Sequence, residues 1–129
     1  MKKRKIPLLL LLLLAFVSPV PTGISAAAET RPAAEQAKID RLLEEMRSSG
    51  AVFIRNGKEY DGEKAAGHLK AKLWWAGRKV QTARDFILGV ASRSEESGRI
   101  YEIRLKDGPT KPLQAWLLER LDAIEKSNG

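Results

Sequence analysis

The chain contains no cysteine and a single histidine, His68, among its 129 residues. Without cysteine it has no disulfide framework, no thiol nucleophile, no zinc–thiolate site and no lipid-attachment cysteine. One histidine and scattered carboxylates do not form a cluster with metal-ligand spacing, so we expect no metal site. The chain also lacks a Gly-rich phosphate loop and a nucleotide fingerprint, and we therefore expect no cofactor.

No apolar run in the sequence is long enough to cross a bilayer as a helix, which needs about twenty residues. The longest run, Leu8–Val17, has about ten residues. It follows the basic residues of Met1–Lys5 and precedes the small residues Ser25–Ala28. This order is typical of a secretory signal peptide. The sequence therefore predicts that residues 1–28 are removed after Ala28, and that the exported product has no transmembrane segment.

The formal net charge of +7 overstates how basic the exported product is. Four of the 23 Lys and Arg lie in the predicted signal peptide, which leaves 19 against 16 acidic residues, or +3. Six of the 19 fall between Lys64 and Arg84, a segment without any acid. A segregated basic face raises the local concentration of anionic partners. The small net charge and the predicted export argue against nucleic acid as the partner.

The pattern of the remaining chain predicts an α+β fold. We expect a flexible tail over residues 29–36 and a single α+β domain over residues 37–126, with the order α-β-β-α-α-β-α. Apolar residues recur with helical spacing from Ile39 to Met46, and Asn56-Gly57 between short apolar runs indicates a hairpin. A short antiparallel sheet covered on one face by helices is the architecture that such elements favour. The predicted helices run over about 37–49, 61–76, 82–90 and 112–124, and the predicted strands over 51–55, 58–60 and 100–106.

Two surfaces are candidates for binding. On the second helix, Lys64, His68, Lys72 and Trp75 share a stripe that could hold an anionic polymer by charge and stacking. The alternative is that the lysines are a solvated face, that His68 lies at the core boundary and that Trp75 is partly buried. At the hairpin tip, Arg55 and Tyr60 flank the turn and form the second candidate. The alternative there is that turn geometry alone selects Asn56-Gly57 and that Arg55 and Tyr60 face each other across the strands.

The catalytic alternative is a small hydrolase or transferase that uses His68 with Ser92 or Ser94, because His68 is the side chain that titrates near neutral pH. Nothing beyond residue identity indicates such a pair, since the chain has no Gly-x-Ser-x-Gly turn. Serines that follow a helix are commonly caps and turn formers. An enzymatic activity is therefore left open and is not the favoured interpretation.

Ordered sequence blocks resemble the YfeK-like family of small exported bacterial proteins, known as domain of unknown function 5329. The blocks are Phe53–Gly57, His68-Leu69 with Lys72, Thr82-Ala83 with Phe86-Ile87, and Ala91-Ser92 with Ser94, Ser97-Gly98 and Tyr101. The resemblance implies a periplasmic protein of the Gram-negative envelope and supplies no activity. The polar residues within these blocks are Arg55, Asn56, His68, Lys72, Ser92, Ser94 and Tyr101.

We expect a non-enzymatic binding or accessory domain that contacts an anionic envelope component or an acidic protein partner. The sequence leaves the oligomeric state open. The candidate binding residues are Arg55, Asn56, Lys64, His68, Lys72, Trp75 and Tyr101.

Overall fold

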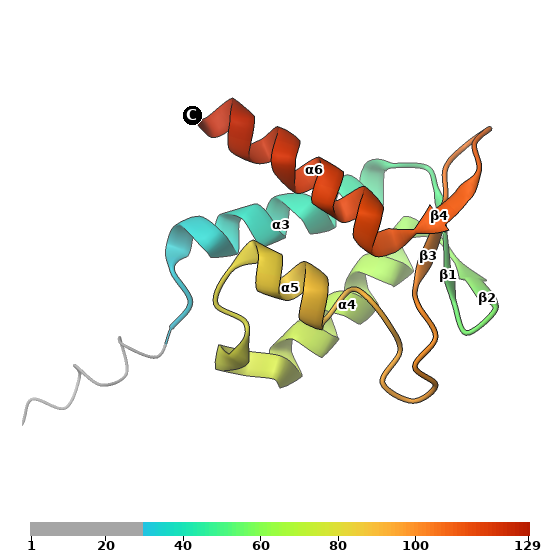
Figure 1. Ribbon diagram of the computed structural model, residues 1–129, viewed down its shortest axis with the longest axis horizontal. Coiled ribbons are helices and arrows are strands. Elements are labelled where there is room, and N and C mark those ends of the chain that lie inside the picture. Colours follow the sequence, from blue (N-terminus) through green and yellow to red (C-terminus); the bar gives the residue numbers. More distant parts are fainter. Residues whose placement is uncertain (1–29) are drawn as a thin grey trace, which may run out of the picture. The chain divides into compact units, whose positions relative to one another are not determined.

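The structure is a computed structural model that describes residues 30–129, so the predicted signal peptide lies outside the described residues (Figure 1). The first described helix, α3, spans Ala33–Ser48 and buries Ile39, Leu42, Leu43 and Met46, the apolar face that the sequence predicts. The prediction of a flexible tail is wrong from residue 31 onward. The helix already begins at Ala33, and the Arg31 side chain donates a hydrogen bond to the Val80 carbonyl at 2.6 Å.

The predicted hairpin forms from β1, Val52–Arg55, and β2, Lys58–Tyr60. Its two central residues both have positive φ, 51° at Asn56 and 80° at Gly57. These are the angles of a type I′ turn, whose twist matches that of the flanking strands. The turn fixes the register, in which Phe53 lies opposite Tyr60 and Arg55 lies opposite Lys58.

Local capping sets the next two helices. Helix α4 spans Gly62–Ala76 and begins where the Asp61 side chain accepts a hydrogen bond from the Lys64 backbone N–H. It ends at Gly77, whose φ of 56° suits glycine, and a 3-10 turn, η2, follows over Gly77–Lys79. Helix α5 spans Ala83–Gly89, and the predicted capping box between Thr82 and Asp85 opens it.

The sheet has four antiparallel strands in the order β2-β1-β3-β4. Strand β3, Glu102–Arg104, is shorter than predicted, because Ile100 makes only an isolated bridge to Arg93. Strand β4, Thr110–Pro112, is not among the predicted elements: the sequence indicates a turn at Asp107–Pro109 and a helix that begins at about Pro112. Pro112 is compatible with β4, because an edge strand needs no N–H from it. The last helix, α6, spans Leu113–Asn128.

The helices lie on one face of the sheet, as predicted for this α+β fold. Figure 1 shows α3 and α6 side by side, with α4 and α5 packed across them and the sheet at one end of the helical layer. Helix α4 contacts β1, and α6 contacts β3 and β4. The core between these elements is apolar, with Phe86, Ile39, Leu42, Met46, Ile87, Ile103, Leu117 and Leu121 as its largest fully buried side chains.

The start of α4 lies in direct contact with the end of α3. Gly62 is buried, and a Cβ built on it would overlap the Met46 carbonyl oxygen and lie 3.1 Å from the Arg47 Cα. No other residue type therefore fits at this crossing without moving one helix.

We predict that Gly62→Ala lowers the free energy of unfolding by about 3 kcal/mol, because the new methyl group meets backbone that has no room to relax. Gly67→Ala is the matched control: Gly67 lies in the same helix with nothing within 4 Å of its Cβ position. There the gain in helix propensity should raise stability by about 0.5–1 kcal/mol. Chemical denaturation of both variants checks the pair, and equal effects would contradict the proposed contact.

Candidate functional site

A cavity of about 220 Å³ lies between α4 and the inner face of the β1–β2 hairpin. Its floor is apolar and comes from four elements or their ends: Met46, Phe53, Leu69 and Leu113. Its rim carries the polar groups of Arg55, Tyr60, Lys64, His68 and Tyr101. Four of these five, Arg55, Lys64, His68 and Tyr101, are among the binding residues that the sequence predicts.

Regular strand and helix geometry brings the rim together. Phe53 and Arg55 are two residues apart in β1 and therefore point to the same face of the sheet. Tyr60 lies opposite Phe53 in the register, so it shares that face. On α4, Lys64 and His68 are four residues apart and lie on one side of the helix.

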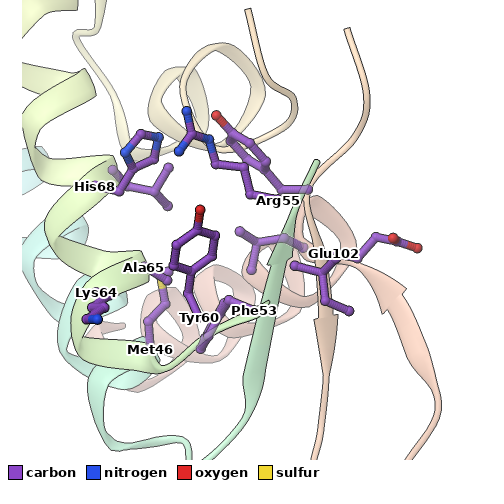
Figure 2. Close-up of a pocket in the computed structure, with 12 residues that line it drawn as sticks. Met46, Phe53, Arg55, Tyr60, Lys64, Ala65, His68 and Glu102 are labelled. Atoms are coloured by element: carbon purple, nitrogen blue, oxygen red, sulfur yellow. The ribbon is translucent and has the colours of Figure 1, made fainter. Parts of the chain in front are cut away.

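Figure 2 shows how the rim side chains are directed. The Tyr60 hydroxyl points into the space between His68 and the Arg55 guanidinium. Glu102 also contributes to the lining, but its carboxylate points away from Tyr60 and His68. The polar groups that face the space are thus cationic or neutral hydrogen-bonding groups.

Arg55 is only partly paired. One terminal nitrogen lies 3.4 Å from the Glu96 carboxylate, in an exposed ion pair at the loop after α5. The Nε of the same guanidinium is buried and has no hydrogen-bond partner among the described residues. A buried donor without an acceptor costs about 1–3 kcal/mol. Arg55, which lines the cavity, therefore carries one donor that the described residues leave unsatisfied.

His68 lies in an environment that disfavours its protonated form. Partial burial lowers the pKa of the imidazole below its ordinary value of 6.5, and the nearby positive charges of Arg55 and Lys72 lower it further. Glu96 acts in the opposite direction and is the weakest of these influences. His68 is therefore mainly neutral at pH 7, so one ring nitrogen can donate a hydrogen bond and the other can accept one.

Lys72 is held by contacts outside the cavity. Its ammonium group donates to the Arg93 carbonyl at 2.8 Å and lies 3.3 Å from the Tyr101 hydroxyl oxygen and 5.0 Å from the centre of the Tyr101 ring. These contacts join α4 to the segment between α5 and β3. Lys72 thus supports the wall that carries Tyr101 and does not line the cavity itself.

Asn56 and Ser94 tie the hairpin tip to the loop after α5. The Asn56 side-chain amide lies 3.3 Å from the Ser94 hydroxyl oxygen, and its carbonyl accepts a hydrogen bond from Ser97. The buried Ser92 hydroxyl lies 2.7 Å from the Ile87 carbonyl and 2.9 Å from the Gln114 side-chain oxygen. Neither Ser92 nor Ser94 lines the cavity that contains His68. The geometry therefore offers no observation in favour of a serine–histidine pair.

Trp75 lies outside the cavity, although the helical stripe groups it with His68. Its side chain is 80% exposed and borders a second, shallow hollow with Lys79 and Leu88. The suggestion of a partly buried Trp75 is therefore wrong. The site also contains features that the sequence candidates omit: the apolar floor, and Tyr60 as part of the same rim. The sequence signal that could have identified Tyr60 is strand alternation from Phe53 to Arg55 combined with the hairpin register, which puts Tyr60 on the same face.

Two properties of the described part of the chain bear on the class of site. Among residues 30–129, no three side chains of histidine, aspartate or glutamate gather closely enough to hold a metal ion. No helix in that range has the length and apolar character needed to cross a membrane.

The fold and the site define a small α+β domain with a cation-rimmed apolar cavity. The sequence profile of a family of unknown function, DUF5329, matches residues 33–125, and the chain belongs to this family. The resemblance seen in the sequence blocks is thereby confirmed.

One similar protein is the uncharacterized protein YfeK of Salmonella typhimurium strain LT2. It is 35% identical over 68 residues, which cover 52% of this chain and 57% of that protein. The chain thus matches less than two thirds of the length of that relative. No solved structure matches the chain.

We predict that His68 titrates below pH 6.5 in the folded protein and that Arg55→Gln raises its pKa, because one of the two nearby positive charges is removed. Lys106→Gln removes an exposed charge outside the site and should leave the pKa unchanged. NMR titration of the imidazole resonances measures both. An equal shift in the two variants would contradict a local effect of Arg55.

The lowered pKa also fixes the sign of a pH dependence of stability. As pH falls below about 6.5, the unfolded chain binds a proton that folded His68 does not yet bind. The free energy of unfolding should therefore fall between pH 6.5 and the folded pKa, and His68 contributes no pH dependence above that window. Denaturation across this range should show a shallower decline for His68→Gln than for the unsubstituted chain.

Proposed function

We propose that this protein is a non-enzymatic binding domain that holds an anionic group attached to a short apolar segment in the cavity between α4 and the hairpin. The observation that carries the proposal is that Arg55, a cation with one buried and unpartnered donor, lines an apolar cavity. A carboxylate or phosphate oxygen is the acceptor that pairs best with a guanidinium.

The electrostatics of the rim support an anionic occupant. Arg55 carries positive charge and the Tyr60 hydroxyl can donate a hydrogen bond, whereas the charged groups of Lys64 and Glu102 both point away from the space between them. An anion between Arg55 and His68 would oppose the influences that lower the His68 pKa. Binding of the anion is thus linked to proton uptake by His68, and each should strengthen the other.

The size of the cavity limits what enters it. An apolar cavity of about 150 Å³ in another protein binds benzene, so 220 Å³ suits an apolar segment only a few atoms larger. Drug-sized ligands use pockets of roughly 300–1,000 Å³. The occupant is therefore a small anion or the end of a larger molecule. The end of an anionic envelope component and an acidic side chain of a partner protein both present this chemistry.

The catalytic alternative lacks a supporting contact. A nucleophile must lie within hydrogen-bond reach of its base, whereas Ser92 and Ser94 make their hydrogen bonds with Ile87, Gln114 and Asn56. Binding accounts for the arrangement of Arg55, Tyr60 and His68 without a nucleophile.

Export completes the proposal. The basic start, short apolar run and small residues before Glu29 support a cleaved signal peptide, and we propose a periplasmic location in a Gram-negative envelope.

We predict that the chain expressed from its own start codon is recovered from the periplasmic fraction with Glu29 as its first residue. N-terminal sequencing of that fraction measures this. A full-length product in the cytoplasmic fraction would contradict export, without bearing on the cavity.

We predict that hexanoate binds the cavity and raises the His68 pKa, whereas hexanol, which lacks the charge, does not raise it. Arg55→Gln should weaken hexanoate binding roughly tenfold or more, because a charge-assisted hydrogen bond is worth about 1.5–3 kcal/mol. NMR titration that follows the His68 imidazole and the Leu69 methyl groups gives the affinity and the location together.

Lys106→Gln is the matched control, since it removes one exposed positive charge outside the cavity. It should bind hexanoate as the unsubstituted chain does. If hexanoate left the His68 and Leu69 resonances unmoved at saturating concentration, or if both variants lost affinity equally, the cavity would not be an anion site.

A further inference from the structure

Two tryptophans protrude side by side from the end of α4, away from the cavity. Trp74 is 73% exposed and Trp75 is 80% exposed, and their rings meet edge to face with centroids 4.9 Å apart. Leu88 of α5 is 49% exposed and borders the same hollow as Trp75. We call Trp74, Trp75 and Leu88 the tryptophan surface. Large apolar side chains gathered on a surface mark an interaction site more often than single ones do.

The packing of α4 explains why these rings face solvent. Leu69 and Leu73 are buried against the core, and this fixes the rotation of the helix about its axis. The opposite side of the helix carries the small, exposed residues Gly67 and Ala71, followed by the two tryptophans. Neither indole contributes to the core or to the cavity, so fold stability does not account for them.

Positive charge surrounds the tryptophan surface. Lys70, Lys79 and Arg84 are exposed, and the segment from residue 64 to residue 84 contains no acid. Within residues 30–129, neither Lys70 nor Lys79 forms an ion pair. These cations are therefore available to an external anion.

Two acids border the hollow beside Trp75, and both have partners. The Asp85 carboxylate accepts hydrogen bonds from the Gln81 and Thr82 backbone N–H groups at the start of α5. Glu95 lies 3.9 Å from the Lys72 ammonium. Asp85 keeps its negative charge, because its partners are neutral backbone groups that lower its pKa. The exposed cations Lys70, Lys79 and Arg84 outnumber it, so the surroundings of the tryptophans are net positive.

We propose that the tryptophan surface docks on an anionic phospholipid membrane. Such a membrane matches both halves of the surface: its headgroup phosphates attract Lys70 and Lys79, and its headgroup–acyl boundary is where indole rings partition. The apolar side chains gain burial only from a partner that is apolar just beneath its charge. The proposal stands independently of the cavity, which lies on a different side of α4.

The test measures binding to vesicles by co-sedimentation and by the blue shift of tryptophan fluorescence. It uses the chain that starts at Glu29, because the apolar run of residues 8–17 would itself enter a bilayer. All the described contacts lie beyond that start, and a cooperative thermal transition verifies that the shortened chain is folded. Vesicles of phosphatidylglycerol with phosphatidylcholine are compared with vesicles of phosphatidylcholine alone.

We predict binding to the anionic vesicles that weakens at high salt. The double variant Trp74→Ala/Trp75→Ala should lose roughly tenfold or more in affinity. Lys70→Gln/Lys79→Gln should lose a similar factor, because each lysine near an anionic surface contributes about a fourfold to sixfold gain. Lys58→Gln/Lys106→Gln removes the same charge from exposed positions in β2 and after β3 and should bind as the unsubstituted chain does.

Three outcomes would overturn the proposal. Equal losses in the two lysine variants would show a diffuse charge effect. Binding to peptidoglycan sacculi but not to anionic vesicles would assign the surface to a glycan. A dimer in analytical ultracentrifugation that the tryptophan variant abolishes would assign it to a second copy of the chain. Arg55→Gln leaves the tryptophan surface intact. Vesicle binding by this variant therefore tests the membrane proposal separately from the cavity proposal.

Discussion

The contact between the Gly62 backbone and the Met46 carbonyl is the constraint on which the other features of this domain depend. It sets how closely the start of α4 approaches the end of α3. Once that end is fixed, burial of Leu69 and Leu73 fixes the rotation of the helix. The rotation of the helix then sets the direction in which each remaining side chain of α4 points. His68 then faces the hairpin, and the tryptophans face solvent.

Lys72 is also on α4, and its side chain makes a structural contact. Its ammonium group bonds the Arg93 carbonyl and contacts Tyr101, so the charge is used to attach the segment after α5 to the helix. That segment also holds the hairpin tip through Asn56 and Ser94. The cavity is therefore enclosed by long-range polar contacts over an apolar floor. Residues that looked like one binding stripe in the sequence divide into a cavity side, a structural contact and an exposed surface.

Local chemistry made much of the fold predictable, and long-range pairing made the rest unpredictable. Asn56-Gly57 and the Thr82–Asp85 box depend on neighbouring residues alone, so the sequence identifies both. Strand β4 exists only because β3 lies beside it, whereas Pro112 locally indicated the start of a helix. Helical spacing predicted that Lys64 and His68 lie together. Helical spacing alone could not show that Tyr60 and the apolar floor complete the site. The hairpin register supplies Tyr60, and the packing of four separate elements supplies the floor.

The free-energy cost of the unpartnered Arg55 Nε matters because the domain is small. A domain of about a hundred residues has only a few kcal/mol of net stability, so a buried donor that costs about 1–3 kcal/mol is a substantial fraction of it. The Arg55–Glu96 pair is exposed and contributes little in return. The same guanidinium also disfavours protonation of His68. The anion that we propose would offset this positive charge, and it would satisfy the donor if the Arg55 side chain turned its Nε toward it. Under the proposed function, part of the binding energy would come from a group that the fold alone leaves unsatisfied.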